Sequence, residues 1–279
     1  MATSNPPRRF HRAFTATGLI PVTAAVLLLG GCGGTHAPTA TAQEGNAPAR
    51  TPTTAGAKGA SQVPEATTYT TVSAAPEDPA PDGATDGLVV HPVKPVAVHD
   101  RPGGRRVAIL PAEQLGGPTW VPVVESSGAW RRILLPSRPN RSTGWISGSD
   151  VQAARTPYTV RVDLTERRLT LLKSGRRVGA WKVAVGSADT PTPTGRTFLM
   201  AALVRDRDAK APGRLVLPLG THSATLDTFG GGPGTVALHG WPDASVFGRA
   251  VTHGCVRVPD DALKALSRVP LGSLVFIDG

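Results

Sequence analysis

The sequence predicts a mainly β protein, and two observations carry that prediction. From about residue 88 to the C-terminus, short apolar segments alternate with Gly- and Pro-containing turn signals, which is typical of strands joined by short loops. Only residues 259–269 have the spacing of an amphipathic helix. At 279 residues the chain is long enough for one large or two modest domains, and its 40% apolar content supports a hydrophobic core.

The N-terminus resembles an export signal. A segment with three arginines is followed by an apolar run over residues 19–29, and Leu29-Gly30-Gly31-Cys32 resembles a bacterial lipobox, in which cleavage before the cysteine precedes attachment of a diacylglycerol. The apolar run is short for a bilayer-spanning helix. We therefore expect residues 1–31 to be a lipoprotein signal peptide, and Cys32 to anchor the exported chain to the outer face of the cytoplasmic membrane.

Residues 32–87 have a different composition. Ala, Thr, Pro, Gly and Ser dominate, large apolar residues are few, and there is no hydrophobic periodicity. Such a segment cannot bury enough apolar surface to offset its ordering entropy. We expect a lipid-anchored, disordered linker that lets the rest of the chain stand off the membrane.

Residues 88–153 are predicted to form a small all-β module. Ala129-Trp130-Arg131 and Gly144-Trp145-Ile146 resemble pieces of a bacterial SH3-like barrel. Two interpretations exist for the tryptophans of the module, Trp120, Trp130 and Trp145. They form a stacking surface for a wall peptide or glycan, or they belong to the core of the module, which is the interpretation we prefer.

Residues 154–279 are also predicted to be rich in strands. The expected strands cover Tyr158–Leu164, Leu169–Leu172, Val178–Val185, Leu215–Leu219, Thr235–His239 and Leu274–Ile277. The segment Gly186–Gly195 must be a shaped loop, because its prolines remove the donors of a strand ladder.

A short helix is expected after Arg257. Pro259, Asp260 and Asp261 favour its first turn, since proline needs no donor there and the carboxylates complement the positive end of the helix dipole. Leu263, Leu266 and Val269 share one face, as in an amphipathic helix.

The formal net charge is +10. A positive surface of that size attracts anionic polymers, such as wall or membrane phosphates or nucleic acid. Because the arginines are scattered rather than gathered in one stripe, a solvated surface is the other interpretation, and we predict no nucleic-acid partner.

Residues 238–257 gather the groups that nucleophilic catalysis needs. Cys255 is the only cysteine after Cys32, and His239 and His253 are candidates for its base. With Cys32 consumed by lipid, Cys255 has no partner in an oxidising compartment. Each residue alone is more often a buried core residue, but the combination with Arg257 favours catalysis.

Each residue of this stretch has a role that its chemistry suggests. His239 ends an apolar strand, and the Gly240 carbonyl can hold one ring nitrogen so that the other faces the thiol. The backbone amides of Gly254 and Cys255 are candidates to stabilise an oxyanion. We expect a neighbouring imidazole and Arg257 to lower the pKa of the thiol. Alternatively, Arg257 binds a substrate carboxylate.

The run Thr252-His253-Gly254-Cys255-Val256-Arg257, with Leu238-His239-Gly240 and Thr192-Pro193-Thr194-Gly195 before it, resembles the L,D-transpeptidase catalytic domain of the YkuD family over about residues 157–279. The resemblance implies a β-sandwich or barrel with a short helix after the catalytic cysteine. It also implies a set of roles: Cys255 as nucleophile, His239 as base oriented by Gly240, His253 as a catalytic-site neighbour, and Thr252, Gly254 and Arg257 as substrate or oxyanion contacts. Thr252 stands where serine is usual, and Asp260 where asparagine is usual.

The resemblance further implies acyl transfer on peptidoglycan stem peptides without a cofactor or metal. The thiolate attacks the third residue of a stem tetrapeptide, D-alanine leaves, and a neighbouring stem captures the thioester in a 3-3 cross-link. Capture by water instead gives an L,D-carboxypeptidase. Because both routes share the acyl-enzyme, the sequence leaves them open.

Other Cys-His chemistries fit less well. A sortase cysteine ends a Thr-Leu-x-Thr-Cys strand with its arginine further away, and a papain-like peptidase places its histidine after the cysteine. A zinc site from His222, His239, His253 and Cys255 has suitable ligand types but no zinc-type spacing. The rival from another class is a catalytically inert wall-binding lipoprotein, which the presence of Cys255, His239 and Arg257 disfavours.

Overall fold

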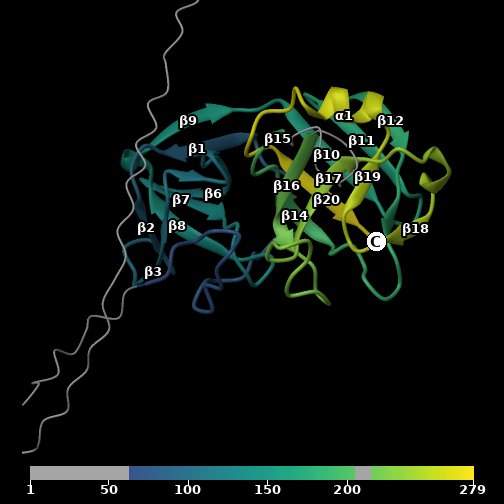
Figure 1. The fold of residues 1–279 in the computed structure, drawn as a ribbon. Coiled ribbons are helices and arrows are strands. Elements are labelled where there is room, and N and C mark those ends of the chain that lie inside the picture. The colour runs from purple at the N-terminus through teal and green to yellow at the C-terminus, as the bar shows by residue number, and fades with distance from the viewer. Residues whose placement is uncertain (1–62, 205–214) are drawn as a thin grey trace, which may run out of the picture. The chain divides into compact units, whose positions relative to one another are not determined.

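The computed structural model describes residues 63–204 and 215–279, all of which fall in one compact unit. These residues are mainly β with one α-helix, as predicted (Figure 1). The predicted signal peptide, Cys32 and the predicted linker as far as residue 62 lie outside them. Within the described ranges no helix is long and apolar enough to cross a membrane.

Residues 88–155 form an antiparallel seven-stranded sheet in the order β3-β2-β8-β7-β6-β1-β9. Its strands are β1 (Leu88–Pro92), β2 (Val96–His99), β3 (Arg106–Leu110), β6 (Val121–Ser127), β7 (Trp130–Leu134), β8 (Thr143–Ser147) and β9 (Val151–Arg155). A small hairpin is formed by β4 (Glu113–Gln114) and β5 (Gly117–Pro118), and a 3-10 helix covers Gly148–Asp150. The last strand therefore ends just beyond the predicted module boundary at residue 153.

The tryptophans of this sheet differ in burial. Trp145 is 4% exposed, which confirms the core interpretation for that residue. Trp120 and Trp130 are half-buried, and their rings lie 5.2 Å from those of His91 and His99. Neither of them presents a fully open stacking face.

Residues 158–204 and 215–279 form two larger sheets. The five-stranded sheet has the order β12-β11-β10-β20-β14 and the four-stranded sheet the order β15-β16-β17-β19. Their strands are β10 (Tyr158–Asp163), β11 (Arg168–Lys173), β12 (Arg176–Lys182), β14 (Gly195–Phe198), β15 (Leu203–Val204), β16 (Leu215–His222), β17 (Thr235–Gly240), β19 (Val256–Val258) and β20 (Leu274–Asp278). β13 (Val185–Gly186) pairs with β18 (Ala250–Thr252), and a 3-10 helix covers Ala244–Val246.

Both sheets contribute to a single apolar core. Val160 and Val162 of β10 belong to it together with Leu238 of β17 and Val256 of β19, and all four are 0% exposed. Each such side chain contributes roughly 1.5–3 kcal/mol relative to leaving it in water. This shared core ties the two sheets together and fixes the position of β17 and β19.

Strand β20 is buried on both faces. Val275 and Ile277 point into the core just described, whereas Leu274 and Phe276 belong to a second core that also contains residues of the seven-stranded sheet. Because side chains alternate along a strand, β20 serves both cores at once. Residues 88–153 and 154–279, which the sequence analysis separated, therefore share apolar packing.

The predicted helix after Arg257 is present as α1 (Asp260–Leu266), with Pro259 at its N-cap and two carboxylates in its first turn. Leu263 and Leu266 are buried in the core. Trp181 of β12 donates a hydrogen bond of 2.6 Å from Nε1 to Asp261. The expectation of a short helix after Cys255 is confirmed.

The structure differs from the predicted disordered linker over residues 63–87. Ala66 and Val72 are buried at 0% and 1% exposure, in the core of the seven-stranded sheet. The Asp78 carboxylate, 0% exposed, accepts two hydrogen bonds of 2.6 Å from Arg196 of β14. Hydrophobic periodicity does not reveal such a segment. Residues 63–87 are ordered by packing and ion-pair contacts with other parts of the chain, and not by a core of their own.

Candidate active site

The predicted catalytic residues lie on and beside two paired strands, β17 and β19. The two strands lie side by side (Figure 1). They run parallel, with Leu238 opposite Val256 and His239 opposite Arg257. Leu238 and Val256 point into the core, so the alternation of side chains places His239 and Arg257 together on the other face. Cys255 directly precedes β19, so its thiol lies at the end of the β17–β19 pair that carries His239 and Arg257.

The His239 ring is oriented by its own strand. Nδ1 of His239 lies 2.8 Å from the carbonyl oxygen of Gly240, the contact that the sequence suggested. Since a carbonyl oxygen only accepts, Nδ1 carries the proton and donates it. The other ring nitrogen, Nε2, is then the one that can take a proton from a thiol.

The pKa of the Cys255 thiol does not have the lowered value that the sequence suggests. Cys255 is a free cysteine and is half-buried. Burial raises the pKa of its thiol above the ordinary value of 9.0, while a backbone hydrogen bond with Ala237 and the charge of Arg257 lower it. Arg257 thus acts in the predicted direction, but desolvation outweighs it, and the prediction of a lowered pKa is wrong.

Thr252 organises the turn that carries the cysteine. Its Oγ1 accepts a hydrogen bond of 3.1 Å from the Gly254 amide and donates one of 2.5 Å to the Cys255 carbonyl. Thr252 is 2% exposed and makes both of these hydrogen bonds within the turn, so it stabilises the turn. Because the Gly254 amide is used inside the turn, the structure does not place it as the oxyanion donor that we expected.

A second loop holds this turn from outside. Thr192 Oγ1 donates to the Gly254 carbonyl at 2.9 Å and accepts from the Gly186 amide at 2.9 Å. Thr190 Oγ1 donates to the Thr252 carbonyl at 3.0 Å. The predicted loop Gly186–Gly195 therefore braces the nucleophile turn, and Gly254, at φ +110°, adopts a backbone conformation that other residues rarely reach.

Trp241 is a member of the site that the sequence analysis missed. The Arg257 guanidinium lies over its ring, 3.4 Å from the centroid, and the His239 ring lies 6.2 Å away. Burial lowers the pKa of Arg257, and its Nε is buried with no hydrogen-bond partner among the described residues. The indole thus fixes the arginine beside the thiol. The available signal was its position immediately after His239-Gly240.

His253 has a different environment from His239. Its side chain is exposed, and its ring lies 5.2 Å from that of Phe229 at an interplanar angle of 31°. Phe229 belongs to the loop between β16 and β17 and is itself 53% exposed. Of the two candidate bases, His239 is the one whose ring nitrogen is fixed by a neighbouring carbonyl in the manner of a triad base.

The four residues considered for a zinc site, His222, His239, His253 and Cys255, do not form a cluster of metal ligands. His222 is fully buried, and its Nε2 lies 3.0 Å from the hydroxyl and 2.8 Å from the carbonyl of Thr68. Burial lowers its pKa to about 4, so the ring is neutral at physiological pH. Over the described ranges no group of three or more His, Cys, Asp or Glu side chains is placed to hold a metal ion.

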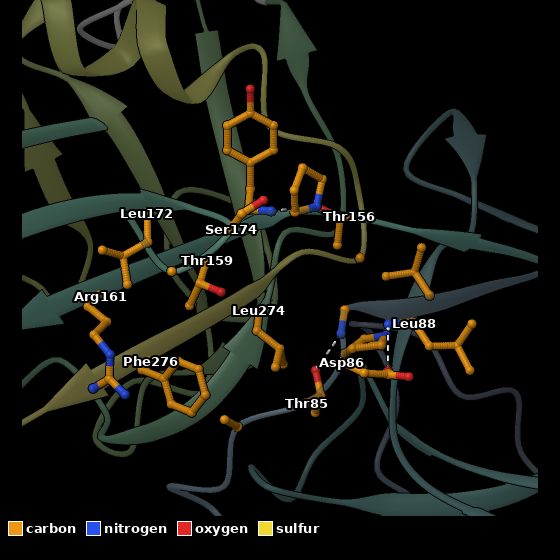
Figure 2. A pocket seen from close by; sticks show the side chains of 18 residues that line it. Thr85, Asp86, Leu88, Thr156, Thr159, Arg161, Leu172, Ser174, Leu274 and Phe276 are labelled. Atoms are coloured by element: carbon orange, nitrogen blue, oxygen red, sulfur yellow. Dashed lines mark hydrogen bonds between the residues drawn. The ribbon is translucent and has the colours of Figure 1, made fainter. Parts of the chain in front are cut away.

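A cavity of about 370 Å³ lies elsewhere, between residues 84–89 and strands β10, β11 and β20 (Figure 2). Arg161, whose guanidinium stacks 4.7 Å from the Phe276 ring centroid, and Leu172 line one part of it. None of the predicted catalytic residues lines this cavity. The chemistry of the Cys255 site is therefore separate from it.

The raised pKa of Cys255 leads to a pH prediction. Only the thiolate is alkylated, and a thiol whose pKa is raised is protonated at neutral pH. We expect the rate of alkylation by iodoacetamide to increase from pH 7 to above pH 9 without reaching a plateau below pH 9. Quenched time points analysed by mass spectrometry measure that rate. A plateau near pH 7 would instead mean a preformed thiolate.

Comparisons with known proteins agree on one family. Residues 157–277 match the family model of the L,D-transpeptidase catalytic domain, YkuD. YkuD of Bacillus licheniformis is 30% identical over 155 residues, which are 53% of this chain and 86% of that protein. YkuD of Bacillus subtilis is 28% identical over 152 residues, which are 52% of this chain and 84% of that protein. An L,D-transpeptidase structure from Mycobacterium smegmatis is 15% identical, with a TM-score of 0.38 over 57% of this chain and 82% of that one.

Proposed function

This chain belongs to the YkuD family of L,D-transpeptidase catalytic domains, and we propose that it forms 3-3 cross-links in peptidoglycan through a thioester on Cys255. One observation carries the proposal. The free thiol of Cys255 precedes β19, and His239, with its ring held by Gly240, lies on the same ladder beside Arg257.

In the acylation step, Cys255 Sγ attacks the carbonyl carbon of the third residue of a stem tetrapeptide. His239 Nε2 takes the thiol proton as the S–C bond forms. The bond to the terminal D-alanine then breaks, and its amine leaves with the proton that His239 returns. The product of this step is a thioester on Cys255 and free D-alanine.

In the second step, a side-chain amine of a neighbouring stem attacks the thioester. A new amide bond forms, the C–S bond breaks, and the amine proton passes through His239 to the departing sulfur. When water takes the place of the amine, the same acyl-enzyme gives a trimmed tripeptide, so L,D-carboxypeptidase activity is the second candidate function. An inert wall-binding lipoprotein is disfavoured, because the Cys255, His239 and Arg257 side chains are all present and share one ladder.

The raised pKa of Cys255 supports a role for His239 as a general base during attack. A neutral thiol needs a group that removes its proton in the transition state, whereas a preformed thiolate does not. Arg257 lowers the pKa of the thiol and so favours charge development on sulfur. We further propose that the chain is exported, that Cys32 carries the lipid anchor, and that the enzyme acts in the cell wall.

A two-arm assay tests the proposed function. The wild-type protein is incubated with a disaccharide-tetrapeptide donor alone, or with donor and an acceptor stem. We expect a cross-linked dimer and free D-alanine when the acceptor is present. Trimmed tripeptide as the only product in both arms would assign the carboxypeptidase instead, and no release of D-alanine in either arm would refute the proposal.

A further inference from the structure

The loop between β16 and β17, residues 223–234, reaches the active site at its tip. The Phe229 ring lies against that of His253, which is two residues before Cys255. Most of the loop side chains are exposed, and Phe229 is 53% exposed. Since the loop buries little apolar surface of its own, its conformation depends on hydrogen bonds, some of them within the loop, such as the pair of 3.0 Å between Phe229 and Gly232.

Arg138, which follows the end of β7, holds this loop from outside. Its guanidinium donates hydrogen bonds to three loop carbonyls, those of Ser223 at 3.1 Å, Leu226 at 3.2 Å and Pro233 at 3.0 Å. These carbonyls lie near both ends of the loop. A guanidinium is a planar fork with five donors, so a single side chain can join three acceptors in this way.

The two ends of the loop are held by the same N-terminal part of the chain. Asn140 donates to the His222 carbonyl at 2.7 Å and accepts from the His222 amide at 2.8 Å. Thr68 bonds the Thr235 hydroxyl at 2.6 Å. The ladder between β16 and β17 is irregular between Pro218 and His222, but His222 pairs with Thr235 and the Ser223 amide donates to the Gly234 carbonyl at 2.8 Å, so the backbone closes the base of the loop.

Close packing around Gly234 shows how tightly the guanidinium fits. Gly234 has φ +70°, and a Cβ at this position would lie 2.3 Å from the Leu226 carbonyl oxygen and 3.1 Å from an Arg138 nitrogen. Only glycine leaves room for the arginine and the loop backbone to meet. The contact between the Arg138 guanidinium and the loop backbone is therefore closely packed, unlike an incidental contact between two surface side chains.

We propose that Arg138 is a positioning residue for acyl transfer: by clamping residues 223–234 it holds Phe229 against His253, where the aromatic ring lines the path of the donor stem peptide. This inference rests on the proposed function of the Cys255 site. It assigns residues outside the catalytic domain a part in the reaction, because a guanidinium beyond β7 sets the shape of a loop beside the nucleophile. Arg138 acts through the loop and does not touch the reacting atoms.

Variants at two positions test the proposal. We expect Arg138→Ala and Phe229→Ala each to lower kcat/KM for the tetrapeptide donor about 10-fold, since small misplacements at a site are costly. The fall in kcat/KM of the double variant should be no greater than the larger of the two single falls, because both substitutions remove the same positioning of Phe229. Arg138→Lys should recover only part of the activity, since an ammonium is not a planar fork. Arg131→Ala is the matched control, because Arg131 donates to the Gly128 and Trp130 carbonyls of its own module.

Two further measurements separate positioning from general damage. Hydrogen exchange of amides in residues 223–234 should accelerate in Arg138→Ala and stay unchanged in Arg131→Ala. Alkylation of Cys255 by iodoacetamide should keep the wild-type rate in both, because neither substitution changes the burial of the thiol or its contacts with Ala237 and Arg257, which together determine its pKa.

The proposal is overturned if loop exchange accelerates while kcat/KM stays at the wild-type value, or if the two single losses multiply in the double variant. It is also overturned if Phe229→Ala, which removes an exposed side chain, leaves donor kinetics unchanged. A wild-type protein without transfer activity would instead refute the proposed function of the Cys255 site. The hydrogen-exchange data would still show whether Arg138 holds residues 223–234 in place.

Discussion

Replacing Cys255 with alanine is expected to abolish acyl transfer, with a loss of at least about 1,000-fold in kcat/KM, because no other group can form the thioester. The fold should survive. The side chain is half-buried, and removing one sulfur from such a position costs on the order of 1 kcal/mol. Release of D-alanine from a tetrapeptide donor measures the activity, and thermal unfolding measures the stability.

Cys255→Ser provides a matched control for this experiment. It keeps the size of the side chain but replaces the thiol with a hydroxyl that is far harder to ionise, so we expect it to be nearly as inactive as the alanine variant. Undiminished D-alanine release by either variant would remove Cys255 from the nucleophile role.

Replacing His239 with alanine is expected to lower kcat/KM by roughly 100- to 10,000-fold, the usual contribution of a general base. His253→Ala should lose less than about 10-fold. The ring of His239 is fixed by the Gly240 carbonyl at 2.8 Å, whereas His253 is exposed and lies against Phe229. Donor kinetics of the two variants, measured side by side, decide between the bases.

The pH dependence of the His239 variant gives an internal control. Above the pKa of Cys255 the thiol is already ionised, so the missing base should matter less, and the activity ratio of wild type to His239→Ala should fall as the pH rises. A larger loss for His253→Ala than for His239→Ala would show that the base had been wrongly assigned.

Much of the catalytic half could be predicted from the sequence. Strand β17 was expected over Thr235–His239 and is observed to Gly240, and the helix after Arg257 was expected from Pro259 and its carboxylates. These predictions succeed because local signals decide them: alternation defines a strand, and a proline followed by acids begins a helix. The grouping of Cys255 with His239 followed from motif spacing.

Long-range contacts could not be predicted in the same way. Residues 63–87 look like a disordered linker, yet Asp78 meets Arg196 across more than a hundred positions of sequence. The pKa of Cys255 depends on how deeply the thiol is buried, which no spacing reveals. Arg138 belongs to the same class, because its three acceptors become neighbours only after the two parts of the chain pack together.

Intact-protein mass spectrometry tests the central claim most directly. Wild-type protein is mixed with a tetrapeptide donor, quenched in acid, and digested to locate any covalent adduct. We expect an added mass equal to the donor minus D-alanine on the peptide that contains Cys255, and its loss when an acceptor amine is supplied. Cross-linked product formed while Cys255 remains unmodified at every time point, or an adduct on another residue, would contradict the thioester mechanism.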